Sequence, residues 1–114
     1  METRQLARLL GALCFEERLQ IIGALIAPGH DGLSTQQMAE MTGLPHSSIP
    51  VHVDYMESTG MVQLRYTNTG KIYSADLDLL EKLFNFMNQN YGAGLRLQLK
   101  AIPARDEAVE TMPN

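Results

Sequence analysis

The stretch GLPHSSIPVHVDYMESTGMV, residues 43–62, decides the fold of this chain. Ile49, Val53 and Met56 follow one another at i, i+4 and i+7, which predicts a helix with one apolar face. Gly60 comes directly after the pattern, where glycine commonly ends a helix in the left-handed conformation. We therefore predict a short amphipathic helix whose other face is open to solvent or to a partner.

Pro50 lies inside this predicted helix and raises a question about where the helix begins. Proline lacks a backbone N–H and costs about 3 kcal/mol in a helix interior, but it is tolerated in the first turn. Two alternatives are open. Either the proline is tolerated in the first turn, or it loosens that turn or delays the start of the helix, which would move Ser47 and Ser48.

Two amphipathic helices are predicted near the N-terminus. The first begins at Thr3, which is a suitable capping residue. Its apolar face consists of leucines with helical spacing: Leu6, Leu9, Leu10 and Leu13. The second covers residues 16–27 and stops at Pro28-Gly29. Its inward face is predicted to be Leu19, Ile22 and Ile26.

A third helix is predicted to begin after Ser34. Ser34 and Gln37 have the spacing of a capping box, in which each side chain bonds the other residue's backbone N–H. This helix ends at Gly43 and is followed by the helix that contains Pro50. Two short helices joined by a tight turn form a helix-turn-helix unit.

A β-hairpin and one more helix are predicted after Gly60. Residues 61–66 alternate between the two faces of a strand, TNTGK supplies a turn, and IYSAD returns as a second strand. The helix that follows has apolar residues at helical spacing: Leu77, Leu80, Phe84 and Met87. The predicted fold is mainly α with a small β-hairpin, which is a winged helix-turn-helix.

The C-terminal part is predicted to lie outside this domain. Residues 95–102 alternate apolar and polar side chains, which fits either a strand or an arm laid on a partner, and the remainder is a polar tail. We therefore divide the chain into a winged-helix domain, 1–92, and an arm with its tail, 93–114.

The composition limits the classes of function. The chain has 114 residues, 45% of them hydrophobic, and a net charge of -4. No apolar run is long enough for a membrane span, and no signal-peptide pattern is found, so we expect a cytoplasmic protein with no membrane partner. The acidic balance argues mildly against nucleic acid as a partner. The common motifs of phosphate loops, dinucleotide sites and hydrolases are absent, so we expect no enzyme.

Four segments together resemble the ArsR/SmtB-type winged-helix transcriptional repressors. ALCFEERLQIIGAL is similar to the family's second-helix motif, with Arg18 at its arginine. LSTQQMAEMTGL resembles the first helix of its helix-turn-helix. SSIPVHVDYMESTGMV is similar to its recognition segment, and RYTNTGKIYSAD to its wing.

The resemblance implies a homodimer, built from the first and last helices, that binds double-stranded operator DNA. The helix after Pro45 would read the DNA. Candidate contacts are the residues left outside its apolar face and the cations of the hairpin: Ser47, Ser48, Val51, His52, Arg65 and Lys71. For His52, packing inside the protein is the alternative to DNA contact.

The family's metal sites do not match this chain. Ser34 and Gln36 occupy the positions of the C-x-C pair, and the last helix offers carboxylates but no histidine. We therefore expect no metal and no cofactor. Cys14 is the single cysteine. It is either a small buried residue or a redox-active thiol.

The sequence thus predicts a dimeric DNA-binding repressor that lacks the usual metal sites. Its inducer is a small molecule at the dimer interface, a redox signal at Cys14, or nothing. The alternative is a winged-helix dimer that acts as a protein-interaction module and no longer binds DNA.

Overall fold

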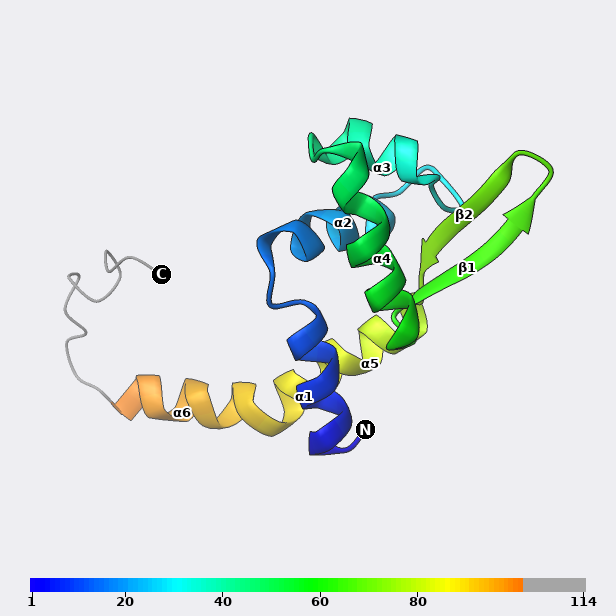
Figure 1. Cartoon of the computed structure of the whole chain (residues 1–114). Helices are drawn as coiled ribbons and strands as arrows, with labels where there is room; N and C mark the ends of the chain where they lie inside the picture. Colours follow the sequence, from blue (N-terminus) through cyan, green and yellow to red (C-terminus); the bar gives the residue numbers. More distant parts are fainter. Residues whose placement is uncertain (102–114) are drawn as a thin grey trace. The chain divides into compact units, whose positions relative to one another are not determined.

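The computed structural model describes residues 1–101, which form helices and one β-hairpin (Figure 1). The helices are α1 (Thr3–Ala12), α2 (Glu16–Ile26), α3 (Thr35–Thr42), α4 (Ile49–Ser58), α5 (Leu77–Met87) and α6 (Ala93–Ala101). The 3₁₀ turn η1 (His46–Ser48) precedes α4, and the π-helical segment η2 (Asn88–Gly92) precedes α6. The strands are β1 (Val62–Thr67) and β2 (Gly70–Ala75). This order confirms the predicted winged helix-turn-helix fold.

Helix α3 is held by its predicted cap. The Ser34 hydroxyl accepts a hydrogen bond from the Gln37 N–H at 3.1 Å, and the Gln37 side chain accepts one from the Ser34 N–H at 2.9 Å. Both ends of the capping box are therefore present. The helix ends at Gly43, whose φ of 76° is left-handed, as predicted. These two local signals define the first helix of the helix-turn-helix.

Helix α4 begins later than the sequence pattern implies. Residues His46–Ser48 form the separate turn η1, and the α-helix starts at Ile49. Pro50 is therefore the second residue of α4, where the missing N–H has no intrahelical acceptor to lose. Pro50 is thus a tolerated first-turn proline, and the α-helix also starts later than its pattern implies, with Ser47 and Ser48 in η1. Gly60, with a φ of 88°, follows the helix as predicted.

The hairpin is joined to the rest of the domain through Tyr73. β1 and β2 are antiparallel, and Leu64 pairs with Tyr73 in their register. On its other side Tyr73 forms an isolated bridge with Leu33, in which the two residues exchange N–H···O=C bonds of 2.8 and 2.9 Å. Gly32 comes directly before this bridge with a φ of 131°. The bridge fixes the base of the hairpin to the segment that leads into α3.

The core of residues 1–83 lies between the helix-turn-helix and the hairpin. Helices α2, α3 and α4 contact one another, β1 contacts α4, and β2 contacts α2 and α3. In Figure 1 the tip of the hairpin extends away from these helices. The largest fully buried side chains come from all of these elements and from α1 and α5: Tyr73, Leu9, Ile21, Met38, Ile49, Met56, Met61, Leu83, Val53 and Val62.

Several predicted helix faces are only partly correct. In α2, Leu19 and Ile26 are 55% and 42% exposed, whereas Ile21 and Leu25 are buried. In α1, Leu10 is exposed, and Glu2 rather than Thr3 is the N-cap residue. In α5, Leu77 and Phe84 are exposed, whereas Leu80 and Leu83 are buried. These helices carry more apolar residues than one face can hold, so spacing alone did not identify the buried set.

The described residues divide into two compact units, which meet between residues 83 and 84. In the second unit, α5 ends at Met87, and η2 and α6 continue the helical backbone to Ala101. Residues 95–101 are therefore helical, and the strand alternative for this segment is wrong. The predicted polar tail lies outside the described residues, and the predicted domain limit at residue 92 stays a prediction. Within residues 1–101, no helix is long and apolar enough to cross a membrane.

Replacing Gly32 by alanine should destabilise the domain. A Cβ at this position would lie 2.7 Å from Ile72 Cγ2 and 2.8 Å from the Tyr73 carbonyl oxygen, in a backbone conformation that alanine rarely adopts. We expect Gly32→Ala to lower the free energy of unfolding by about 1–3 kcal/mol in urea titrations.

Gly23 is the matched control, because it lies inside α2 and a Cβ there meets no atom within 4 Å. Gly23→Ala should raise the free energy of unfolding by about 0.5–1 kcal/mol. Equal stability of Gly32→Ala and the wild-type protein would contradict the close approach at the bridge.

Candidate nucleic-acid interface

The start of α4 is apolar on both its inner and its outer side. Ile49, Val53 and Met56 are each 0% exposed, which confirms that they face inward. Val51 is 69% exposed in the same turn. At roughly 100° per residue, Val51 lies about 200° around the helix from Ile49 and from Val53. It is therefore directed away from the core.

Ser47 and Ser48 lie in η1, just before α4, and differ in what they bind. The Ser48 hydroxyl donates a hydrogen bond to the Pro45 carbonyl at 2.8 Å. Ser47 is exposed, and its hydroxyl has no hydrogen-bond partner within residues 1–101. Ser47 thus offers a hydroxyl to a ligand, whereas Ser48 closes its own turn.

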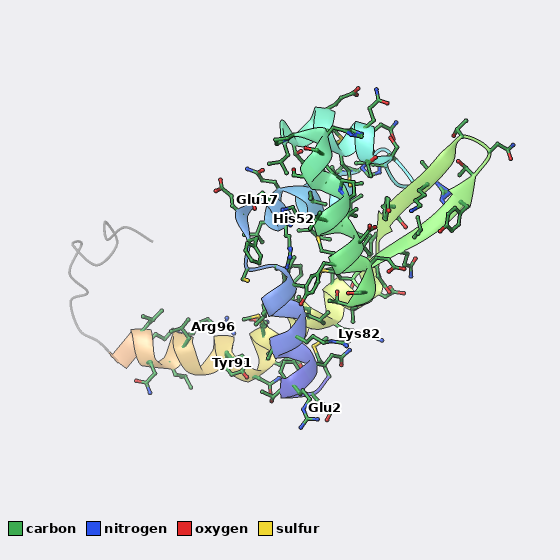
Figure 2. All side chains as sticks on the ribbon, in the orientation of Figure 1. Glu2, Glu17, His52, Lys82, Tyr91 and Arg96 are labelled. Atoms are coloured by element: carbon green, nitrogen blue, oxygen red, sulfur yellow. The ribbon has the colours of Figure 1, made fainter. Side chains whose placement is uncertain are left out.

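His52 is engaged by the protein at both ring nitrogens. Its Nδ1 accepts a hydrogen bond of 3.2 Å from Arg18 Nε, and its Nε2 lies 3.6 Å from Glu17 Oε2. Because Nδ1 accepts, the neutral ring carries its proton on Nε2, next to the Glu17 carboxylate. Figure 2 labels Glu17 and His52 where α2 meets α4. The side chain is 16% exposed. The geometry favours packing over DNA contact at His52.

Arg18 joins α2 to α4 by stacking as well as by this hydrogen bond. Its guanidinium carbon lies 4.4 Å from the ring centroid of Phe15 and 4.3 Å from that of Tyr55. The planar cation thus stacks on two aromatic rings, one directly before α2 and one on α4. We refer to Phe15, Glu17, Arg18, His52 and Tyr55 as the arginine cluster.

The arginine cluster was not predicted from the sequence. Phe15 and Arg18 are three residues apart, and so are His52 and Tyr55, which is the spacing of neighbours on one helix face. That spacing could have predicted a contact within each pair. It could not predict that the two pairs contact each other.

Asp54 joins the other side of α4 to the hairpin. The Tyr73 hydroxyl donates a hydrogen bond of 2.9 Å to Asp54 Oδ1. Tyr73 is 1% exposed. Burial, and then the hydrogen bond to the Asp54 carboxylate, raise the pKa of Tyr73 to about 12. The phenol therefore keeps its proton and its bond to α4 at neutral pH.

The two cations of the hairpin lie on opposite faces of it. Lys71 pairs with Tyr66 and Arg65 with Ile72, and paired residues share a face while neighbours along a strand alternate. Lys71 therefore shares its face with Tyr73, which contacts α4. Arg65 lies on the other face, and its guanidinium donates a hydrogen bond of 3.3 Å to the Asp31 carbonyl. From the sequence alone, Lys71 and Arg65 were both candidates for contact with the DNA backbone, and the difference between their faces was not predicted.

Cys14 is exposed, between α1 and α2, so its interpretation as a buried residue is wrong for this chain. At the family's C-x-C positions, the Ser34 side chain is occupied by the α3 cap. Within the described residues 1–101, no three His, Cys, Asp or Glu side chains gather in a way that could hold a metal ion.

Removing the Tyr73 hydroxyl should change how stability depends on pH. The folded-state pKa of Tyr73 is about 12, against 10.0 for an ordinary tyrosine. The folded protein therefore keeps a proton that the unfolded chain releases, and this stabilisation is complete below pH 10 and disappears as the pH rises through 12. We expect Tyr73→Phe to lose about 0.5–1.5 kcal/mol at pH 7. Its stability should then fall less than that of the wild type between pH 10 and 12. Urea titrations of both proteins between pH 10 and 12 test this prediction. If the free energies of unfolding of the two proteins fell equally with pH, the raised pKa of Tyr73 would be contradicted.

Replacing Arg18 by lysine should weaken the link between α2 and α4, because an ammonium group cannot lie flat between two rings. We expect Arg18→Lys to lower the free energy of unfolding by about 1–2 kcal/mol, from two cation–π contacts. Arg8→Lys, at an exposed arginine of α1 that stacks on no ring within residues 1–101, is the control and should cost little. Equal losses in the two variants would rule out a stacking role.

Solved structures of winged-helix regulators share this architecture. The ArsR-like transcriptional regulator from Rhodococcus sp. RHA1 matches with a TM-score of 0.67 and 23% identity, over 86% of this chain and 89% of that one. The homodimeric winged helix-turn-helix DNA-binding domain Mb0332 from Mycobacterium bovis matches with a TM-score of 0.61 and 23% identity, over 90% and 89%. The transcriptional repressor BigR from Xylella fastidiosa matches with a TM-score of 0.61 and 18% identity, over 77% and 87%.

No protein-family model and no curated protein sequence matches the chain. The likeness therefore rests on structure, and it agrees with the resemblance that the sequence motifs carry. The chain has the winged helix-turn-helix fold of the ArsR-type transcriptional regulators.

Proposed function

We propose that this protein is a homodimeric winged-helix transcriptional repressor that binds double-stranded operator DNA with η1 and the start of α4. One observation carries the proposal. The outer side of this segment is open at Ser47 and Val51, while its inner side is anchored by fully buried residues. An exposed, rigidly held helix start is what a recognition helix brings into the major groove.

Ser47 and Lys71 are our principal candidates for DNA contact. Ser47 is exposed at the N-terminal side of the helix, where a hydroxyl can bond a phosphate or a base edge. Lys71 is exposed on the hairpin face that also carries Tyr73, whose hydroxyl bonds α4. Lys71 can therefore contact a phosphate of the same DNA duplex that α4 binds. We assign Arg65 a weaker backbone contact and His52 the task of orienting α4.

Dimerisation through the first and last helices is supported by exposed apolar side chains on those helices. On α1, Leu10 is 37% exposed. In the second unit, Phe84, Leu95 and Leu97 are 59%, 59% and 70% exposed. Side chains of this size are more often found covered, and a second copy of the chain would cover them. Mb0332, which shares the fold, is itself described as homodimeric.

We further propose that the repressor responds to no metal at the family's standard sites, because Ser34 caps α3 where a thiolate ligand would stand. The exposure of Cys14 satisfies one requirement of a redox signal, access to an oxidant. A small-molecule inducer is the alternative.

A specific observation favours the second candidate function, a protein-interaction module. Residues 19–64, which include the whole helix-turn-helix, contain no Lys and no Arg. DNA-reading surfaces normally carry a basic patch, since phosphate contacts supply most of the affinity. In a DNA-binding protein of this sequence, those cations must come from elements outside residues 19–64, among them α1 and the hairpin.

Binding to the DNA upstream of the protein's own gene distinguishes the two functions. We expect fluorescence anisotropy to show tighter binding to this duplex than to a scrambled one, with affinity that falls steeply as salt rises. Lys71→Ala should weaken binding to all duplexes alike. It should also reduce the salt slope by about one unit per lost phosphate contact, or about two for a dimer.

Lys82→Ala removes the same charge from α5, outside the helix-turn-helix and the hairpin, and is the matched control. It should leave the salt slope unchanged. Weak binding that is equal on both duplexes would contradict the repressor proposal and favour the protein-interaction module.

A further inference from the structure

The most exposed residue at the start of α4 is apolar. Val51 is 69% exposed in the first turn, so most of this apolar side chain is in contact with water. It is also rigid, because a β-branched side chain in a helix has one strongly preferred rotamer. Pro50, directly before it, fixes its own φ and stiffens the same turn. The result is a rigid, exposed apolar side chain on the side of α4 opposite Ile49 and Val53.

The rest of the segment lacks the side chains that usually read bases. Residues 46–58 contain no Arg, Lys, Asn or Gln. Arg and Lys are the usual partners of guanine, and Asn and Gln those of adenine. Of the carboxylates that could accept a bond from cytosine, Asp54 already accepts the Tyr73 hydroxyl. This segment therefore has few side chains that could form strong hydrogen bonds to base edges.

One group in the major groove suits an exposed valine. Thymine carries a 5-methyl group there, and it is the apolar feature that distinguishes an A·T pair from the other pairs. A polar base edge would instead lose water to the valine without gaining a hydrogen bond. The chemistry of the helix start therefore selects thymine as the base opposite Val51.

We propose that Val51 is a specificity-determining residue, which contacts the 5-methyl group of one thymine in each operator half-site. The inference rests on the proposed function, because it requires that α4 lies in the major groove. It goes beyond that function in naming the base that the helix recognises and the group by which recognition occurs.

Replacement of thymine by deoxyuridine tests this contact atom by atom, because deoxyuridine pairs identically and lacks only the methyl group. In the bound upstream duplex, each thymine is replaced singly by deoxyuridine and the affinity is measured by anisotropy. For the wild-type protein, one substitution in each half-site should weaken binding about fourfold, the value of burying one methyl group. The other substitutions should have smaller effects.

Val51→Ala should bind the unmodified duplex more weakly and be insensitive to deoxyuridine at that position, because the contact is already lost. Met41→Ala is the control: it removes another exposed apolar side chain, 52% exposed on α3, and should keep the fourfold sensitivity. Urea titrations should give both variants the stability of the wild type.

The outcomes separate the two proposals. Selective binding without a sensitive thymine, or equal deoxyuridine sensitivity in wild type and Val51→Ala, would overturn the methyl contact and leave the repressor function intact. Absence of selective binding to any duplex would overturn the repressor function, and the methyl contact with it.

Discussion

The burial of one side of α4 is the constraint on which the rest of the structure depends. Ile49, Val53 and Met56 have no exposed surface, and α2, α3 and β1 all contact the helix that carries them. Full burial of such side chains contributes roughly 1.5–3 kcal/mol each. Because these three residues set the rotation of α4 about its own axis, they also determine which residues point outward. The outward direction of Val51 is thus a consequence of the core.

Two side-chain links hold the flanks of α4. On one flank, Arg18 lies between Phe15 and Tyr55 and bonds His52, which joins α4 to α2. On the other, Asp54 accepts the Tyr73 hydroxyl, which joins α4 to the hairpin. Both links use polar groups that a recognition helix could otherwise offer to DNA. Part of the polar surface of α4 therefore holds the helix in position, and at the start of the helix the exposed side chain is the apolar Val51.

The distribution of charge follows from the same arrangement. The helix-turn-helix itself carries no Lys or Arg, so attraction to phosphate and recognition of bases are assigned to different elements in the proposed repressor. Lys71 and Arg65 lie on opposite faces of the hairpin, and Lys71 is the one that shares its face with Tyr73. The acidic net charge of the chain is compatible with such a division, because a local patch governs steering more than the total does.

The sequence by itself determined what depends on neighbours along the chain. The capping box at Ser34, the end of α3 at Gly43, the left-handed Gly60 and the inward side of α4 followed from local spacing and were all correct. Only the tertiary structure decided which of several apolar residues α2 buries, how closely Gly32 approaches Tyr73, and that Arg18 meets Tyr55. The physical reason is that capping and chain termination are properties of one segment. A buried face or a stacked cation instead depends on a partner contributed by a distant segment, and periodicity carries no information about that partner.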